Sequence, residues 1–231
     1  MNIIVTGASS GIGYETVLKI AKSGKHKIIA IARNAPKLEK LKNENKTESE
    51  IFALPFDLQS IGDYAKLHQT IVEKTDKIDI LINNAGYLVN KPFELTSQNE
   101  IFDMFQTNVF AAGELIRILI NDFSENSHIV NISSMAGFQG SVKFPGLSWY
   151  SAAKAAIASL TECLANELKP KKISVNCLTI GAVQTDMLSA AFPGFEAPLK
   201  PAQMAEYISH FALTAHTFMN GRIIPVQLST P

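Results

Sequence analysis

Short apolar runs alternate along this chain with longer segments whose apolar residues recur at helical spacing. The apolar runs predict strands at residues 2–5, 27–32, 50–54, 78–82, 128–132, 173–178 and 221–227. The segments between them predict helices at residues 12–23, 36–42, 61–74, 98–121, 149–168 and 202–215. Strands joined by helices must pair in parallel, and right-handed crossovers place those helices on both faces of the sheet. The sequence therefore predicts an α/β fold, a doubly wound parallel sheet of about seven strands.

The composition is that of one globular domain spanning residues 1–231. Hydrophobic residues make up 46% of the chain, which excludes disorder for most of it. Lys and Arg together number 21, and so do Asp and Glu. Without an excess of positive charge, neither nucleic acid nor an anionic membrane surface is expected as a partner.

The chain also lacks the signals of export. No apolar run reaches the roughly 18 residues that a membrane-spanning helix needs, and the first residues lack the basic region of a secretory signal. The only cysteines are Cys163 and Cys177, too few for a disulfide framework or a zinc site. We therefore expect a cytoplasmic protein with reduced, buried thiols and no metal site.

The turn between the first predicted strand and helix is rich in glycine and serine, reading Thr-Gly-Ala-Ser-Ser-Gly-Ile-Gly over residues 6–13. Glycines let the backbone approach a pyrophosphate closely, and the N-terminus of the helix attracts the anion. The candidate dinucleotide-binding residues of this turn are Gly7, Ser9, Ser10, Gly11, Ile12 and Gly13. The alternative is an ordinary tight connection between a strand and a helix.

The end of the second predicted strand bears on the choice of cofactor. In a dinucleotide fold an acid here holds the ribose of NAD, whereas a cation holds the 2′-phosphate of NADP. Residues 31–34 read Ile-Ala-Arg-Asn, with one cation and no acid. Arg33 therefore favours NADP(H) over NAD(H), because a guanidinium matches a phosphate in charge and geometry. An exposed arginine that merely ends a strand is the alternative.

Tyr150 and Lys154 lie four residues apart in a predicted helix, so their side chains share one face. A free phenol has a pKa of about 10, and a neighbouring ammonium favours the phenolate. The pair would make Tyr150 a general acid or base near neutral pH. Taken alone, the same spacing is common on helix surfaces and carries no function.

Four segments together resemble the short-chain dehydrogenase/reductase family, in order and over essentially the whole chain. They are the turn at residues 6–13, Asn-Asn-Ala-Gly at 83–86, Ile-Ser-Ser at 132–134, and Tyr-Ser-Ala-Ala-Lys at 150–154. The resemblance implies a Rossmann fold in which Tyr150 exchanges a proton with the substrate oxygen and Lys154 lowers its pKa and holds the nicotinamide ribose. It implies that Ser134 hydrogen-bonds the substrate oxygen and that Asn108 holds a water linked to the lysine.

The resemblance also implies further cofactor contacts. Asp57 and Leu58 match the pair at the adenine, Asn84, Ala85 and Gly86 match the segment along the adenosine ribose, and Val183 and Thr185 match the turn at the carboxamide. Ser134 and Tyr150 are sixteen residues apart, more than is usual in the family, so the intervening loop carries an insertion. For each of these positions an ordinary turn residue is the alternative.

These features lead us to expect an NADP(H)-dependent oxidoreductase, a carbonyl reductase that acts on a small-molecule carbonyl or secondary alcohol. The alternative is an NADP(H)-binding regulatory or sensor protein without catalysis. Two irregular stretches near late strand ends are rich in apolar residues, which favours an apolar substrate. These residues are Met135, Phe138, Phe144, Leu147 and Trp149, followed by Phe192, Pro193 and Phe195.

The resemblance further implies a homodimer or homotetramer, paired through the helices at 98–121 and 149–168. The apolar residues expected to form that surface are Phe102, Phe105, Val109, Leu115, Ile157, Leu160 and Leu164. The alternative is that both helices bury these residues against their own sheet.

Overall fold

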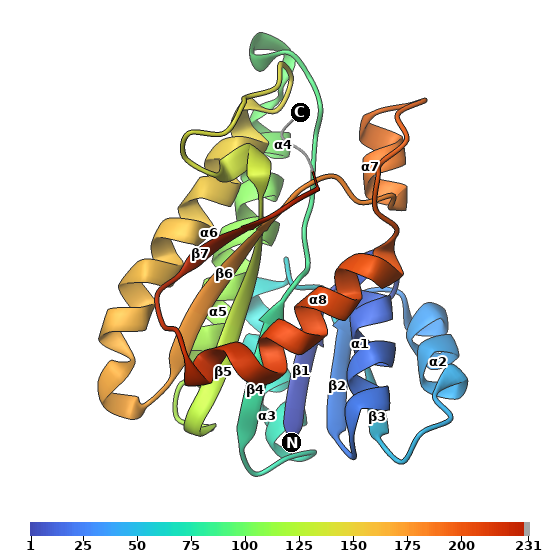
Figure 1. The fold of residues 1–231 in the computed structure, drawn as a ribbon, viewed down its shortest axis with the longest axis vertical. Helices are drawn as coiled ribbons and strands as arrows, with labels where there is room; N and C mark the ends of the chain where they lie inside the picture. Colours follow the sequence, from blue (N-terminus) through green and yellow to red (C-terminus); the bar gives the residue numbers. More distant parts are fainter. Residues whose placement is uncertain (229–231) are drawn as a thin grey trace.

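The computed structural model describes residues 1–228, so the last three residues of the predicted domain lie outside the described residues. Within this range seven strands form one parallel sheet in the order β3-β2-β1-β4-β5-β6-β7 (Figure 1). The strands are β1 (Asn2–Thr6), β2 (Lys27–Ala32), β3 (Glu50–Pro55), β4 (Ile78–Asn83), β5 (Phe123–Ser134), β6 (Ser174–Ile180) and β7 (Ile223–Val226). The prediction of a doubly wound α/β sheet is confirmed.

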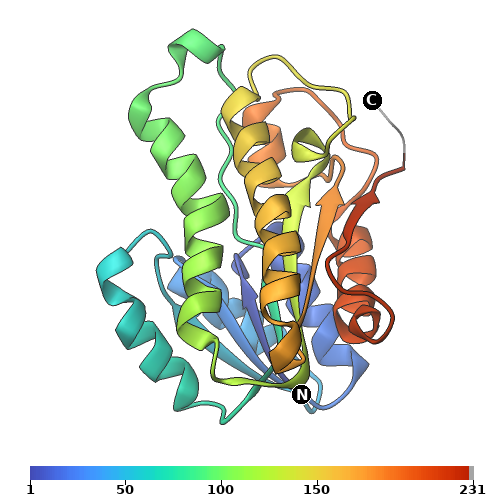
Figure 2. The same ribbon diagram turned by 90° about the vertical axis from the view of Figure 1, so that its left-hand side faces the viewer.

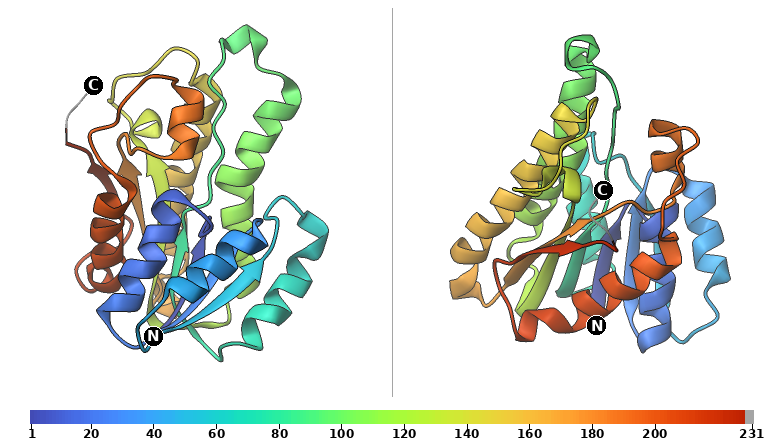
Figure 3. Two further views of the ribbon diagram at one scale, coloured as in Figure 1. Left: turned by 90° about the vertical axis from the view of Figure 1, so that its right-hand side faces the viewer. Right: turned by 45° about the horizontal axis from the view of Figure 1, so that its top comes forward.

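Helices cover both faces of this sheet (Figures 2 and 3). One face carries α1 (Gly11–Ser23), α2 (Ala35–Glu44) and α8 (Pro201–Thr214), and the other carries α3 (Tyr64–Val72), α5 (Ala111–Leu119) and α6 (Ser148–Glu167). The remaining helices are α4 (Gln98–Phe105) and α7 (Asp186–Ala191). Short helical turns are η1 (Ile61–Asp63), η2 (Phe93–Leu95), η3 (Gln106–Phe110), η4 (Met135–Gly137), η5 (Lys169–Lys171) and η6 (Ala215–Thr217).

Two apolar cores lie on the two faces, because successive side chains of a strand point to opposite sides. In β1, Ile3 and Val5 pack with α1 and α8, while Ile4 packs with α3 and α5. All three residues are at most 1% exposed. Burying a side chain of this size contributes about 1.5–3 kcal/mol, so the sheet is held rigidly between its helices.

Two departures from the predicted elements fall beside the site. The helix predicted at 98–121 is broken by η3, a π-helical turn at Gln106–Phe110. Residues 185–200 were expected to be irregular, but they contain α7, which begins where the Thr185 hydroxyl accepts a hydrogen bond from the Leu188 N–H at 3.2 Å. Six residues are too few to show helical periodicity in a sequence.

The surface predicted for subunit pairing is smaller than expected. Val109, Leu115 and Ile157 are 9%, 0% and 2% exposed, because they pack inside their own chain. Phe102 on α4 is 56% exposed and remains available. The prediction of buried thiols is half wrong, since Cys177 is buried but Cys163 is exposed.

Among residues 1–228, no helix is both long and apolar enough to cross a membrane. The same residues contain no group of three or more His, Cys, Asp or Glu side chains that could hold a metal ion.

Candidate functional site

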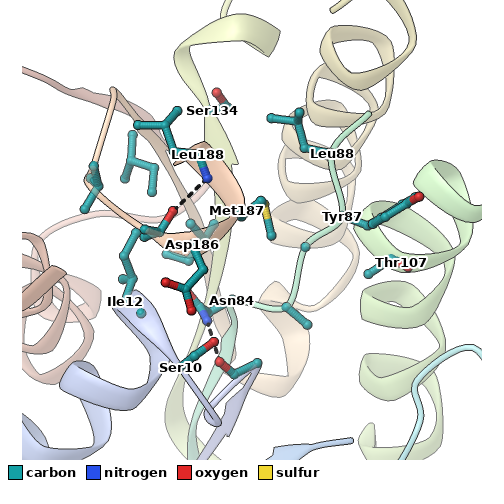
Figure 4. A pocket seen from close by; sticks show the side chains of 18 of the residues that line it. Ser10, Ile12, Asn84, Tyr87, Leu88, Thr107, Ser134, Asp186, Met187 and Leu188 are labelled. Atoms are coloured by element: carbon teal, nitrogen blue, oxygen red, sulfur yellow. Dashed lines mark hydrogen bonds between the residues drawn. The ribbon is translucent and has the colours of Figure 1, made fainter. Parts of the chain in front are cut away.

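A cleft of about 1230 Å³ opens at the carboxyl ends of the strands. β1 and β4 are neighbours in the sheet, but the helix after β1 packs on one face and the helices after β4 pack on the other. The chain connections therefore diverge at this point of the sheet, called a topological switch point, and a crevice opens between them. Ser10, Asn84, Ser134 and Met187 surround this space from four parts of the chain (Figure 4). Of the predicted site residues, those that line the cleft are Gly7, Ser9, Ser10, Gly11, Ile12, Arg33, Asp57, Leu58, Asn84, Ala85, Gly86, Ser134, Tyr150, Lys154, Val183 and Thr185. Gly13 and Asn108 lie behind it.

The glycine turn after β1 is packed too tightly for side chains. Gly7 has φ of +67°, and a Cβ added there would lie 2.9 Å from the Ala85 Cα. A Cβ on Gly13 would overlap the Gly7 carbonyl oxygen. Ser10 precedes α1 without capping it through its side chain, and Gly11 and Ile12 of the first turn of this helix line the cleft. A close-packed turn with open amides fits a dinucleotide pyrophosphate.

Thr6 joins the ends of β1 and β4, a role that the sequence analysis missed. Its hydroxyl oxygen accepts hydrogen bonds from the N–H groups of Asn84 and Ala85, both at 3.0 Å. The Asn84 side chain in turn donates to the Thr6 carbonyl oxygen at 3.0 Å. These contacts place residues 84–86 beside the glycine turn, as a cofactor spanning both strands requires.

Arg33 follows β2 and is exposed at the cleft. Among the described residues its side chain makes no hydrogen bond or ion pair within the protein, so its guanidinium can meet a ligand. Lys37, a second exposed cation that the sequence analysis missed, lines the same end of the cleft. The Asn34 side chain brings it there by accepting a hydrogen bond from the Lys37 N–H at 3.0 Å, which starts α2. Two cations at this end suit a phosphate.

Tyr150 and Lys154 share the face of α6 that borders the cleft. The Lys154 Nζ lies 5.8 Å from the centre of the Tyr150 ring and donates to the Ile132 carbonyl oxygen at 2.9 Å. Lys154 is only 4% exposed, and burial lowers the pKa of its ammonium to about 8, while the nearby Cys177 acts weakly in the other direction.

The pKa of Tyr150 differs from the expectation. Burial raises it to about 12, and the neighbouring Ser134 hydroxyl opposes this shift only in part. The ammonium was expected to lower this pKa, but it lies beside the ring and is hydrogen-bonded to a backbone carbonyl. In this geometry the phenol is neutral near pH 7 and suits a proton donor.

Ser134 ends β5 and lines the cleft with Tyr150. Its Oγ accepts a hydrogen bond from the Ala136 N–H at 3.2 Å, which caps the short turn η4. The neighbouring Ser133 hydroxyl instead donates to the Lys154 carbonyl oxygen at 2.6 Å and is buried against α6. Gly137 in η4 was missed by the sequence analysis, yet a Cβ there would come 2.5 Å from the backbone of Lys154. The close contact between η4 and α6 therefore holds Ser134 next to Lys154.

Asn108 lies within η3 and is 3% exposed. Its side-chain amide donates to the carbonyl oxygens of Tyr87 and Met104 at 2.7 and 2.8 Å, and its Oδ1 accepts from the Tyr87 N–H at 3.2 Å. A Cβ on Gly86 would lie 3.2 Å from this Oδ1 and 3.5 Å from the Lys154 Nζ. Asn108 thus fixes the segment after β4 next to Lys154, behind the cleft wall.

Of the eight expected apolar residues, five line the cleft and three do not. Met135, Phe144, Leu147, Phe192 and Phe195 line the cleft. Phe138, Pro193 and Trp149 are not part of the lining, contrary to expectation. Trp149 stacks on Phe93 with ring centres 5.3 Å apart.

Comparisons with known proteins agree with this geometry. Residues 1–194 match the short chain dehydrogenase family, and the chain belongs to it. The NADP-dependent 3-hydroxy acid dehydrogenase of Schizosaccharomyces pombe is 32% identical over 228 residues, which cover 92% of this chain and 86% of that protein. The crystal structure of 3-ketoacyl-(acyl-carrier-protein) reductase from Brucella melitensis complexed with NADH superimposes with a TM-score of 0.86 at 28% identity, covering 98% and 96% of the two chains.

The fatty acyl-CoA reductase of Acinetobacter baylyi is 33% identical over 198 residues, or 80% of this chain. The match covers only 63% of that relative's length, less than two thirds. Short-chain dehydrogenases and reductases bind nicotinamide cofactors, act on small molecules and often form oligomers. Relatives of this chain carry both NADP and NADH in their names, so the family alone leaves the choice of cofactor open.

Proposed function

We propose that this protein is an NADP(H)-dependent carbonyl reductase, which moves a hydride between the cofactor and a small ketone, aldehyde or secondary alcohol. The observation that carries the proposal is the meeting of Ser134, Tyr150 and Lys154 in one cleft with the glycine turn at its other end. A purely sensing protein would need the glycine turn but not a half-buried phenol beside a buried ammonium.

The cofactor fits residues on both sides of the switch point. The glycine turn would hold its pyrophosphate, with Asp57 and Leu58 at the adenine and Asn84, Ala85 and Gly86 along the adjoining ribose. Lys154 would hold the nicotinamide ribose, with Val183 and Thr185 at the carboxamide. When bound, the cofactor supplies or accepts the hydride, and the protein supplies alignment and the proton.

The preference for NADP(H) rests on Arg33 and Lys37 together. No acid follows β2 where an NAD-binding chain would need one, since the strand runs directly into Arg33 and Asn34. From Arg33 to Ser134 the sheet crosses three strand spacings, about 14 Å in all, which suits a ligand as long as a dinucleotide.

Tyr150 and Ser134 have different roles at the substrate oxygen. Tyr150 donates its proton as negative charge develops there during reduction, and its raised pKa keeps that proton available at neutral pH. The Ser134 hydroxyl is already oriented by the end of β5 and stabilises the same charge without reorganisation. Asn108 acts behind them, by fixing the chain beside Lys154.

The decisive experiment replaces Tyr150 by phenylalanine, which removes one oxygen. NADPH binding, followed by cofactor fluorescence, should survive, while carbonyl-dependent oxidation of NADPH should fall by about 10²–10⁴-fold. In the unmodified protein, reduction should be nearly independent of pH from about 6 to 7, because the phenol stays protonated below its pKa of about 12 and the Lys154 ammonium below its pKa of about 8. Alcohol oxidation should rise with pH over the same range, since it requires the phenolate. Near-normal reduction by folded Tyr150→Phe would instead favour the sensor function.

Exposed aromatic residues and the cysteines bear on the proposed assembly and compartment. A homodimer or homotetramer would cover Phe102 and Phe110, which are 56% and 49% exposed on α4 and η3. Both apolar cores share one sheet, in keeping with a single domain over residues 1–231. The two free cysteines suit the reducing cytoplasm.

A further inference from the structure

The cleft continues beyond Ser134 and Tyr150 into a space with apolar walls, which we call the substrate chamber. One wall comes from the inserted loop through Met135, Phe144 and Leu147, and the facing wall comes from α7 and the chain after it through Met187, Leu188, Phe192 and Phe195. Met187 and Phe195 are 41% and 49% exposed, a large exposure for such side chains. An apolar ligand in the chamber would cover them, and that burial would favour binding.

The charges around the chamber disfavour an anion. The cations that line the described part of the cleft are Arg33, Lys37 and Lys154. The first two lie at the end of β2, about 14 Å from Ser134 by strand spacing, and Lys154 is buried behind Tyr150. Asp103 and Asp186 also line the cleft, and neither forms an ion pair among residues 1–228. Asp186 extends toward Asn84 and Ser10, at the glycine-turn end of the cleft (Figure 4). A carboxylate or phosphate in the substrate chamber would therefore meet apolar walls and none of the three lining cations of the described residues beside it.

Lys143, the one cation of the inserted loop, is occupied by the loop itself. Its ammonium donates to the carbonyl oxygens of Ala136 and Phe138 at 2.9 and 2.6 Å and to the Ser141 Oγ at 2.9 Å. An ammonium has three protons, and here each has an acceptor. Lys143 therefore closes the end of η4, as cations at helical C-termini do, and its three N–H donors are all taken up by the loop rather than offered to a ligand.

Hydrogen bonds between loops hold the chamber walls in place. The Lys91 N–H donates to the Gly146 carbonyl oxygen at 3.0 Å, which ties the inserted loop to the segment after β4. The Asn90 side chain donates to the Ala191 carbonyl oxygen at 2.8 Å, which ties the same segment to the end of α7. The two apolar walls are thus joined through residues 90 and 91, and the chamber is formed before a substrate enters.

We infer that the substrate of this site is an uncharged ketone or aldehyde with an apolar body, and that the chamber rejects carbonyl compounds bearing a carboxylate or phosphate. This inference rests on the proposed function for the reaction, but the selectivity comes from the chamber alone. An anion transferred from water to this chamber would lose hydration without gaining a cation, which is costly.

A matched pair of ligands tests the inference: para-acetylbenzoate and its methyl ester, which share the ketone and differ in one charge and one methyl group. Binding to NADPH-loaded Tyr150→Phe protein is measured by titration calorimetry, so that turnover plays no part. The ester should bind at least about tenfold more tightly than the carboxylate. Equal or tighter binding of the carboxylate, or no binding of the ester, would overturn the inference.

A variant that adds the missing cation sharpens the test. Met187→Lys, built on the Tyr150→Phe protein, should tighten carboxylate binding by about tenfold or more, since an ion pair at a partly covered site can contribute that much. The same variant should weaken binding of the ester, which loses its apolar contact with Met187. Phe218→Lys is the matched control, because Phe218 is 85% exposed and lies outside the cleft. An unchanged affinity for the carboxylate in Met187→Lys would count against the inference. Turnover of the ester by the unmodified protein tests the proposed function separately, because selective binding without turnover would refute only the reaction.

Discussion

Replacing Lys154 by methionine should change how the stability of this protein depends on pH. Burial lowers the pKa of the Lys154 ammonium from its usual 10.5 to about 8. Each pH unit is equivalent to about 1.4 kcal/mol, so keeping this charge buried at neutral pH costs about 3 kcal/mol. Methionine fills a similar volume without charge and removes that cost.

A second effect opposes this gain. The Lys154 ammonium donates to the buried Ile132 carbonyl oxygen, and its loss leaves that acceptor unpaired at a cost of about 1–3 kcal/mol. At pH 7 we therefore expect Lys154→Met to be at least as stable as the unmodified protein, by about 0–2 kcal/mol. The pH dependence separates the two effects, because only the charge effect titrates.

The sign of that dependence follows from proton binding. Between the two pKa values the unfolded chain keeps the proton that the folded protein has released, so the unmodified protein gains stability as pH rises. From about pH 7 to about pH 9.5 its free energy of unfolding should rise by about 2 kcal/mol relative to Lys154→Met. Urea denaturation followed by circular dichroism at four pH values measures this difference.

Lys66→Met is the matched control, since it makes the same substitution at a lysine that is exposed on α3. A stability difference for Lys154→Met that stays flat over this range would refute the burial argument. The variant should also lose turnover and bind NADPH more weakly, because Lys154 is proposed to hold the ribose.

Three further variants test separate parts of the site. Arg33→Ala should weaken NADPH binding by about 1.5–3 kcal/mol and leave NADH little changed, as measured by fluorescence titration, and equal losses would remove Arg33 from cofactor choice. Gly137→Ala should destabilise the protein by about 1–3 kcal/mol in urea melts and slow reduction, because its Cβ would push η4 away from Lys154. An unchanged stability and rate would show that η4 can move away from α6 without cost. Phe102→Glu should lower the mass of any oligomer seen by light scattering, whereas a monomeric unmodified protein would contradict the proposed assembly.

The sequence was sufficient for the sheet and for the residues around the cleft, because both depend on local patterns. Apolar runs mark buried strands wherever helices cover both faces of a sheet, and strand ends fix which residues meet at one edge. Tyr150 and Lys154 share a helix face through their spacing alone.

The missed features depend on contacts between distant segments. Burial sets the pKa of Tyr150, and that burial is assembled from β5, α6 and the loops around them, which no spacing reveals. Thr6 became important only because β4 lies beside β1, and Gly137 only because η4 rests on α6. Lys37 was overlooked because its orientation depends on how the Asn34 side chain starts α2.

The inserted loop offers a place to redesign this enzyme. Every residue from 138 to 146 is at least partly exposed, so neither apolar core depends on them. Loops of this kind tolerate changes of sequence and length much better than strands do. A library that varies Phe144 and its neighbours while retaining Ser141 and Lys143 would reshape one chamber wall and leave η4 capped. New substrate ranges could then be selected on an unchanged sheet and an unchanged cofactor end.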